Sequence, residues 1–208
     1  MATPAAVRRP RASAPASAAP KREAILRAAT DVFASRGFFT AQVADVARAA
    51  GVAAGTVYLY FRSKDDLLVS IFERTMREAL AEGQTAVAQV SDPAERLRHL
   101  ARLHLARLGR DRNLAIVFQI ELRQSTKFME RFSATLLRDY LGLIRTAIVD
   151  GQAAGVFRTS LNATAVAKML FGALDEMATN RILSRRRYVL EADADAVIDL
   201  FVKVARGR

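Results

Sequence analysis

The stretch from Ala47 to Lys64 has the order of parts that a helix-turn-helix requires. Apolar residues recur from Val43 with the i, i+3, i+4 spacing of a short amphipathic helix. Gly51 follows, where a left-handed backbone ends a helix at little cost. A second short helix is expected over about residues 54–60, and in helix-turn-helix proteins this second helix enters the DNA major groove. The sequence therefore predicts a DNA-binding head.

The outer face of the second helix carries hydroxyl and aromatic groups. We expect Val57 to pack inward, which leaves Thr56, Tyr58 and Tyr60 facing outward or to the flank. Hydroxyl groups can donate to phosphate oxygens, and rings can pack on sugars. Gly55 would allow the helix N-terminus to approach the DNA backbone closely. The alternative is a helical hairpin with a tyrosine-rich surface and no DNA partner.

The start of the following helix is marked by Ser63 and Asp66, which have the spacing of a capping box. Lys64 lies in the first turn of that helix, where the partial positive charge of the helix N-terminus disfavours a cation. A phosphate partner would offset that repulsion. We therefore interpret Lys64 as a contact to the DNA backbone.

Composition excludes several other classes of protein. The 208 residues are 51% hydrophobic and include no Cys, which rules out disulfides and thiolate metal sites. No apolar run is long enough to span a bilayer, and the N-terminus lacks the apolar segment of a signal peptide, so we expect a cytoplasmic protein. His99 and His104 are the two histidines, and no catalytic triad, phosphate loop or metal-ligand spacing is present. We expect neither an enzyme, nor a cofactor, nor a metal.

The net charge of +11 is concentrated at the N-terminus, where five cations precede Glu23, the first acidic residue. Residues 1–20 are mostly Ala, Pro, Ser and Arg, with little to bury. This composition predicts a disordered basic arm. Two interpretations of the arm remain open: nonspecific phosphate contacts that weaken with salt, or a solubilising tail.

The rest of the sequence predicts helices almost without interruption. Four of the five Pro lie in the arm, and no sustained period-2 alternation indicates a strand. We expect an all-α protein with a three-helix head over residues 21–66 and a larger effector-binding and dimerisation body over residues 67–208. Expected helices after the second one are capped or ended by local signals, and they cover about residues 64–82, 93–109, 113–125, 129–154, 163–184 and 192–205.

The last two expected helices have wide apolar faces, and such faces at a chain end need a partner. Either the two helices pack inside the monomer, or they build a four-helix dimer interface, which we favour. The residues expected at that interface are Leu170, Phe171, Leu174, Val197, Leu200, Phe201 and Val204.

The segment from Asn113 to Ser125 is almost wholly apolar in its first half and mixed in its second. A helix this apolar is largely buried, so its polar groups need partners inside the protein. Either Glu121 or Gln119 pairs with Arg123, or Arg123 or Gln124 meets the polar end of an elongated apolar ligand.

Residues 25–68 resemble the DNA-binding head of TetR-type repressors. The matching residues are Ile25-Leu26, Ala28-Ala29, Phe33, Gly37-Phe38, Val43, Val46-Ala47, Ala50-Gly51-Val52, Gly55-Thr56-Val57-Tyr58, Tyr60-Phe61 and Lys64. The resemblance implies DNA contacts at Thr56, Tyr58, Tyr60 and Lys64. Two positions depart from the family pattern: Ala53 replaces an N-capping Ser or Thr, and the hydroxyl usual at position 41 lies one residue earlier, at Thr40.

Beyond the head, the sequence is similar to the acyl-CoA-responsive repressors of fatty-acid degradation, a FadR-type subgroup of the family. Ala53, which departs from the general family pattern, resembles this subgroup. The motifs that carry this likeness are Asn113-Leu114-Ala115-Ile116-Val117, Gln119, Glu121-Leu122-Arg123-Gln124-Ser125 and Phe171-Gly172-Ala173-Leu174-Asp175-Glu176. The resemblance implies a homodimeric repressor that long-chain acyl-CoA releases from a palindromic operator.

Under that hypothesis the acyl chain needs an apolar tunnel, and its affinity should rise with each buried methylene. Our candidates for the tunnel wall are Leu97, Leu100, Leu103, Phe118 and Leu122, with Arg123 and Gln124 near the polar end. The alternative is a TetR-type repressor that responds to a drug or another lipophilic small molecule.

Overall fold

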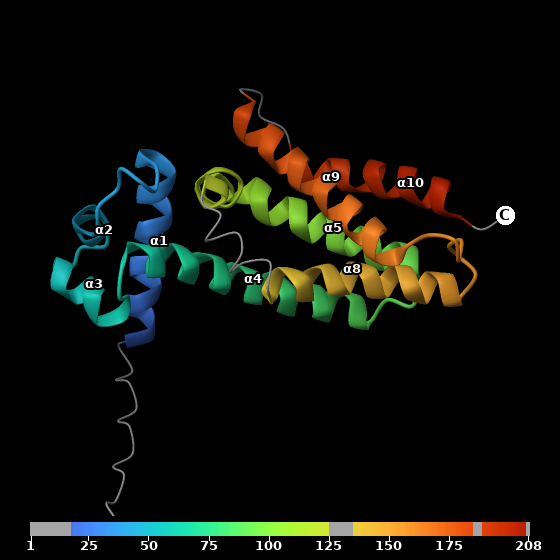
Figure 1. The fold of residues 1–208 in the computed structure, drawn as a ribbon, viewed down its shortest axis with the longest axis horizontal. Coiled ribbons are helices and arrows are strands. Elements are labelled where there is room, and N and C mark those ends of the chain that lie inside the picture. The colour runs from blue at the N-terminus through green and yellow to red at the C-terminus, as the bar shows by residue number, and fades with distance from the viewer. Residues whose placement is uncertain (1–17, 125–134, 185–188, 207–208) are drawn as a thin grey trace, which may run out of the picture.

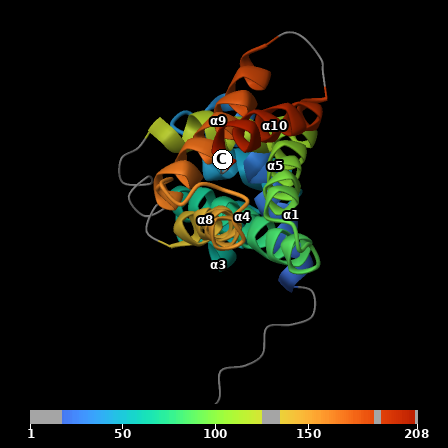
Figure 2. The same cartoon turned by 90° about the vertical axis from the view of Figure 1, so that its right-hand side faces the viewer.

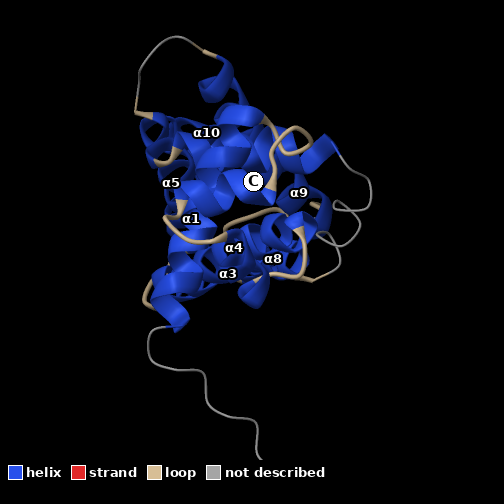
Figure 3. Ribbon diagram, turned by 90° about the vertical axis from the view of Figure 1, so that its left-hand side faces the viewer, coloured by secondary structure: helices blue, strands red, loops and turns tan. Residues whose placement is uncertain are grey.

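The computed structural model describes residues 18–124, 135–184 and 189–206. Within these ranges the chain is helical, and a single bridged pair, Phe157 and Arg206, forms without extending into a strand. Figure 3 shows helices throughout the described chain. The expected all-α class is confirmed. Of the expected arm, residues 1–17 lie outside the described residues, whereas residues 18–20 form the first turn of a helix.

Three helices form the head, at the left of Figure 1: α1 (Ala18–Arg36), α2 (Val43–Ala49) and α3 (Ala54–Tyr60). Gly37 and Gly51 have φ angles of +78° and +67°, so the expected left-handed glycines end the first two helices. Val57 and Phe61 are buried. Their burial fixes which side of α3 faces the core of the head.

The helix α4 (Lys64–Ala88) runs without a break from the head into the body (Figure 1). Ser63 Oγ accepts a hydrogen bond from the Asp66 N–H at 3.1 Å, which confirms the expected cap. The Asp66 carboxylate in turn accepts from the N–H of Arg62 at 2.8 Å, one residue before the position usual in a capping box. The boundary expected after residue 66 lies within the first turn of this helix.

The body is a layered bundle, seen nearly end-on in Figure 2. After α4 its main helices are α5 (Pro93–Arg110), α8 (Leu136–Ala153), α9 (Ala163–Leu183) and α10 (Ala194–Ala205), with a 3-10 turn, η3 (Leu190–Asp193), before the last. Since α5 packs against α4, α8, α9 and α10, it is the central helix. Asp92 caps α5 and Asn162 caps α9 through their side chains, as expected. No helix in the described ranges has the length and hydropathy needed to cross a membrane.

The helix expected over residues 113–125 is present from Arg112 to Gln124, but it is not a regular α-helix throughout. It consists of α6 (Arg112–Ile116), a π-helical turn η1 (Val117–Glu121) and a 3-10 turn η2 (Leu122–Gln124). Wide π turns often occur at functional sites, because they reposition side chains. Here Gln119 and Glu121 are buried and bind partners on different elements, which a regular α-helix would not present in the same way. Residues 125–134, where the next helix was expected to begin, lie outside the described residues.

Candidate DNA-binding head and effector cavity

The outer face of α3 is the candidate DNA-reading surface. Tyr58 is 56% exposed, Thr40 and Gly55 are also exposed, and Thr56 and Tyr60 are half-buried. Sequence reasoning missed Leu59, which is 82% exposed. Its position two residues from both inward-facing residues, Val57 and Phe61, was the signal that could have found it. Ala53 provides no side-chain cap to α3, as its missing hydroxyl implied.

The structure corrects the interpretation of Lys64. Its Nζ donates to the backbone carbonyls of Phe38 at 2.7 Å, Phe39 at 3.1 Å and Ala41 at 2.9 Å, and it also lies 4.6 Å from the centre of the Phe38 ring. An ammonium group has three N–H donors, and all three are used here. Lys64 therefore holds the α1–α2 loop on α4, and carbonyl oxygens rather than a phosphate offset its unfavourable position at the helix start.

The same loop is bound from the other side by Glu121 of η1. This buried carboxylate accepts a hydrogen bond from the Phe38 N–H at 2.6 Å. Nearby, Asn113 Nδ2 donates to Asp31 of α1 at 2.9 Å. The segment after α5 is thus attached directly to the head.

Gln119 and Arg123 bind Asp175 of α9 rather than Glu121. Gln119 Nε2 donates to one carboxylate oxygen of Asp175 at 2.5 Å, and Arg123 forms an ion pair with the other. Thr179 adds a hydrogen bond to Gln119 Oε1 at 3.1 Å. These polar groups satisfy one another across η1, η2 and α9, as buried polar groups must.

Beside this cluster lies an apolar cavity of about 130 Å³ between α4, α5, η1, α8 and α9. Its apolar lining includes Phe72, Met76, Leu108, Phe118, Leu122 and Phe171. The rings of Phe72 and Phe118 stack at 5.3 Å between centroids. Such a lining suits a hydrocarbon ligand, and the polar cluster at Asp175 forms one part of the wall.

His104 of α5 is the unusual residue in this cavity. Its Nε2 is buried without a hydrogen-bond partner, and its Nδ1 lies 3.5 Å from the hydroxyl of Tyr140. Phe171 contacts the imidazole edge-on at 5.4 Å. Burial lowers the pKa of His104 to about 4, so the imidazole is neutral at physiological pH, and burial also raises the pKa of Tyr140.

A second, much smaller void of about 10 Å³ also borders His104. It shares Ala79 and Arg107 with the apolar cavity and reaches Leu100, Leu103 and Gly83. His104, Ala79 and Arg107 therefore form a wall common to the two voids, along the α4–α5 contact.

The expected effector residues divide between these voids. Phe118, Leu122 and Arg123 line the apolar cavity, and Leu100 and Leu103 line the smaller void. Leu97 is buried in the core and Gln124 is exposed, and neither borders either void, so the structure does not support these two as ligand contacts. Sequence reasoning missed His104, although a polar residue within the Leu97, Leu100, Leu108 stripe of α5 was a readable signal.

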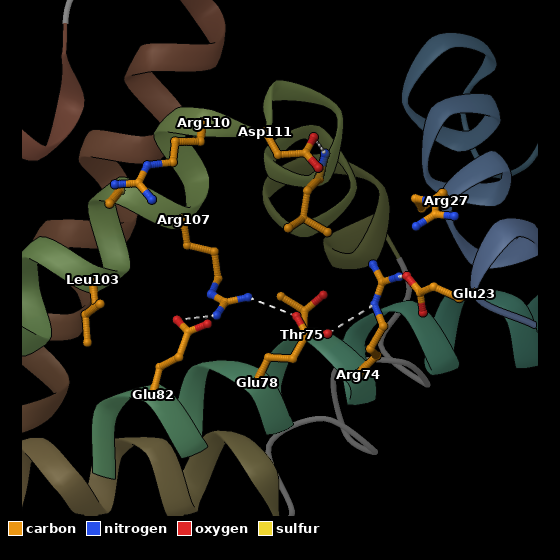
Figure 4. Close-up of a pocket in the computed structure, with 12 residues that line it drawn as sticks. Glu23, Arg27, Arg74, Thr75, Glu78, Glu82, Leu103, Arg107, Arg110 and Asp111 are labelled. Atoms are coloured by element: carbon orange, nitrogen blue, oxygen red, sulfur yellow. Dashed lines mark hydrogen bonds and ion pairs between the residues drawn. The ribbon is translucent and has the colours of Figure 1, made fainter. Parts of the chain in front are cut away.

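A polar pocket of about 420 Å³ lies on the opposite side of Arg107, between α1, α4, α5 and α6. Figure 4 shows Arg107 reaching Glu78 and Glu82, at 3.1 and 2.6 Å, and Arg74 beside Glu23. Four basic residues in its lining are matched by four acidic ones. The pocket is electrically neutral and its main cations are already paired.

The expected dimer residues fall into three groups, which are buried, exposed and half-buried. Leu170, Leu174 and Phe201 are buried within the single chain, so they are not available to a partner, and this part of the prediction is wrong. Both helices carry two apolar faces, and the sequence does not show which one meets the monomer core. The exposed side carries Leu200 at 66% and Val204 at 62%, with Met169 on α9 as a residue not foreseen. Phe171 and Val197 are half-buried.

A helix-turn-helix head, attached by a continuous helix and a buried hydrogen bond to a body with an apolar cavity, defines a ligand-responsive DNA-binding regulator. Residues 25–71 match the family of bacterial regulatory proteins of the tetR family, and residues 72–204 match the C-terminal region of YsiA-like proteins. The chain belongs to the TetR family of transcriptional regulators, and its relatives are regulators rather than enzymes.

Similarity extends over nearly the whole chain. The fatty acid metabolism regulator protein of Bacillus subtilis strain 168 is 33% identical over 88% of this chain and 94% of that protein. The fatty acid degradation regulator FadR of Bacillus halodurans is similar in structure, with a TM-score of 0.83, 36% identity, and coverage of 88% and 99% of the two chains. FadR of B. subtilis in complex with stearoyl-CoA is also similar in structure, with a TM-score of 0.82 and 32% identity. This match covers 86% of this chain and 97% of that chain.

Proposed function

We propose that the chain is a dimeric repressor of fatty-acid degradation genes, which long-chain acyl-CoA releases from a palindromic operator in the cytoplasm. The observation that carries the proposal is the full-length likeness to a regulator that binds stearoyl-CoA. The physical features of this chain support it independently, at the cavity, at the contact between cavity and head, and on the exposed face of α9 and α10.

The apolar cavity supports an acyl chain as the ligand. Each buried methylene contributes about 0.8 kcal/mol to the free energy of binding. Affinity therefore rises with chain length until the cavity is full. A volume of about 130 Å³ is small for a long chain. Binding must therefore displace side chains, and Met76 and Phe118 on its wall are suited to move. A long chain would bind an opened form of the body more tightly than the closed one.

The carrier part of acyl-CoA is polyanionic, and a second hollow supports its binding. A groove of about 550 Å³ between α8 and α9 shares Leu137 with the apolar cavity. Among the described residues its lining includes Arg138, Arg145 and Lys168 and no carboxylate. In contrast to the neutral pocket around Arg107, this groove offers a net positive charge to phosphates.

The contact between η1 and the head supports a mechanism of release. Phe118 lines the cavity, and Glu121, one turn along the same π-helical segment, holds the Phe38 N–H. An acyl chain that displaces Phe118 would alter this hydrogen bond and with it the angle of the head. A ligand shifts the equilibrium only if it binds the two arrangements unequally. A cavity of about 130 Å³ would bind a long acyl chain less tightly than an enlarged one, which supplies that difference in affinity.

The exposed apolar face of α9 and α10 supports a dimer. Leu200 and Val204 lie on this face, and burying them against a second copy would remove apolar area from water. A two-fold dimer presents two α3 helices to DNA, so the operator half-sites should lie about 34–36 Å apart, or a multiple of that.

The test is a titration of the purified protein with free CoA and with acyl-CoAs of 4 to 18 carbons, measured by calorimetry. The proposal predicts binding that tightens with chain length, with free CoA bound far more weakly than the long-chain acyl-CoAs. A flat response across lengths, or preferential binding of planar cationic drugs, would contradict the proposal and favour the alternative of a drug-responsive TetR-type repressor.

A further inference from the structure

His104 lines the apolar cavity, and its Nε2 is buried without a hydrogen-bond partner among the described residues. Among the described residues, two buried side-chain nitrogens lack a hydrogen-bond partner: His104 Nε2 and Arg74 Nε. Arg74 lines the polar pocket, with Glu78 Oε1 at 3.9 Å, whereas His104 lines the apolar cavity and the smaller void. A buried polar atom without a partner destabilises the fold, so its presence needs an explanation.

The neighbours of His104 fix how that nitrogen can act. Burial keeps the ring neutral, with Arg107 and Asp175 as the charged groups that act on it in opposite directions. A neutral imidazole has one N–H donor and one acceptor. When the Tyr140 hydroxyl, 3.5 Å from Nδ1, donates to that atom, the proton resides on Nε2. His104 then carries one N–H donor without an acceptor in the closed protein, and a ligand that displaces neighbouring side chains could accept from it.

The other polar groups of the cavity wall are already occupied. Gln119 and Arg123 bind Asp175, and Arg107 is paired with Glu78 and Glu82. Binding a ligand through these groups would first require breaking those contacts. A bare hydrocarbon would leave His104 Nε2 unpaired, whereas a carbonyl oxygen within the hydrocarbon would satisfy it.

We propose that His104 donates a hydrogen bond from Nε2 to the thioester carbonyl oxygen of the bound acyl group, and so positions the ligand at the wall that the two voids share. The inference rests on the proposed function, because it assigns a ligand atom within the same cavity. It makes His104 a residue that distinguishes acyl thioesters from equally hydrophobic molecules without a carbonyl.

The experiment compares palmitoyl-CoA with S-hexadecyl-CoA, a thioether with the same carbon count and no carbonyl. Calorimetry on the full chain should show about tenfold tighter binding of the thioester to the wild type, the range expected for one buried hydrogen bond. In His104→Phe the ratio should fall to about one, through loss of thioester affinity alone. Equal binding of both ligands by the wild type, or a preference retained in His104→Phe, would overturn the inference.

A second variant separates hydrogen bonding from shape. His104→Gln places an amide N–H at a reach similar to that of Nε2, so it should keep most of the preference for the thioester. A His104→Gln variant that loses the preference as fully as His104→Phe would count against the inference. His104→Phe should melt at or above the wild-type temperature, because it removes an unpaired polar atom.

The outcome for the wild type also separates this inference from the proposed function. Binding of neither CoA derivative would overturn the proposed function, and the inference with it. Tight binding of both derivatives with equal affinity would support a CoA ligand with a long hydrocarbon chain. It would overturn only the role of His104.

Discussion

Glu121 and Phe38 lie 83 residues apart in the chain, and a hydrogen bond of 2.6 Å joins the carboxylate of one to the backbone N–H of the other. The bond links the π-helical turn beside the apolar cavity to the loop between the first two helices of the head. Lys64 binds the carbonyl of the same Phe38 at 2.7 Å. Glu121 of the body therefore binds the backbone N–H of Phe38, and Lys64 at the start of α4 binds its carbonyl oxygen.

Glu121→Gln should weaken the communication between ligand and DNA. A neutral amide accepts a weaker hydrogen bond than a carboxylate, so the head is less tightly attached to η1. We expect acyl-CoA affinity to stay within about twofold of wild type, while the factor by which acyl-CoA weakens operator binding falls about fivefold. Glu176→Gln, the same charge change on an exposed residue of α9, is the control. An unchanged coupling factor in Glu121→Gln would refute the proposed path.

Lys64→Met should destabilise the protein and leave the salt dependence of DNA binding unchanged. The ammonium binds three loop carbonyls, so its removal should lower the free energy of unfolding by about 2 kcal/mol. No phosphate contact is lost, so the slope of log affinity against log salt should not change. Arg62→Ala, which removes a charge from an exposed residue two positions earlier, should leave the melting temperature unaltered. A slope reduced by about one in Lys64→Met would restore the phosphate interpretation.

His104 should make the protein acid-sensitive. Burial lowers its pKa to about 4 from an ordinary 6.5, so between these pH values the unfolded chain binds a proton here that the folded chain does not. Stability contributed by the neutral imidazole is therefore complete above pH 6.5 and is lost as the pH falls toward 4. From pH 7.5 to 5, urea unfolding at fixed protein concentration should show about 2 kcal/mol more loss for wild type than for His104→Phe. Equal losses would show that His104 titrates normally.

Leu200→Arg should produce a monomer. The side chain is 66% exposed on the outer face of α10, so a charge there is tolerated by the single chain but not by an apolar dimer interface. Light scattering should give half the wild-type mass, and operator affinity should fall by at least about tenfold, because two half-sites are no longer bound together. Thr146→Arg on the exposed side of α8 is the control and should remain dimeric. A dimeric Leu200→Arg would place the interface elsewhere.

Features set by neighbours in the sequence could be predicted. The caps at Ser63, Asp92 and Asn162 depend on a side chain and amides two or three residues away, and the glycines after α1 and α2 depend on one backbone angle. The helical class and the outward direction of Tyr58 follow from periodicity alone.

Features set by distant segments could not be predicted. Lys64 was misinterpreted because the three carbonyls that bind it come from residues 23 to 26 positions earlier. The change from α-helix to π and 3-10 turns within residues 112–124 accompanies hydrogen bonds to α9 and to the head. Leu170 and Leu174 were assigned to the interface because two apolar faces of one helix look alike in sequence.

In the function that we propose, operator DNA and acyl-CoA each weaken the binding of the other to the protein. The most direct measurement is the operator affinity of the wild-type dimer, by fluorescence anisotropy on a duplex selected by the protein from random sequences, with and without saturating palmitoyl-CoA. The account predicts operator binding weakened by at least about tenfold, and, by reciprocity, palmitoyl-CoA bound more weakly by the same factor when operator is present. Equal operator affinity with and without palmitoyl-CoA, although the ligand binds the free protein, would contradict the account.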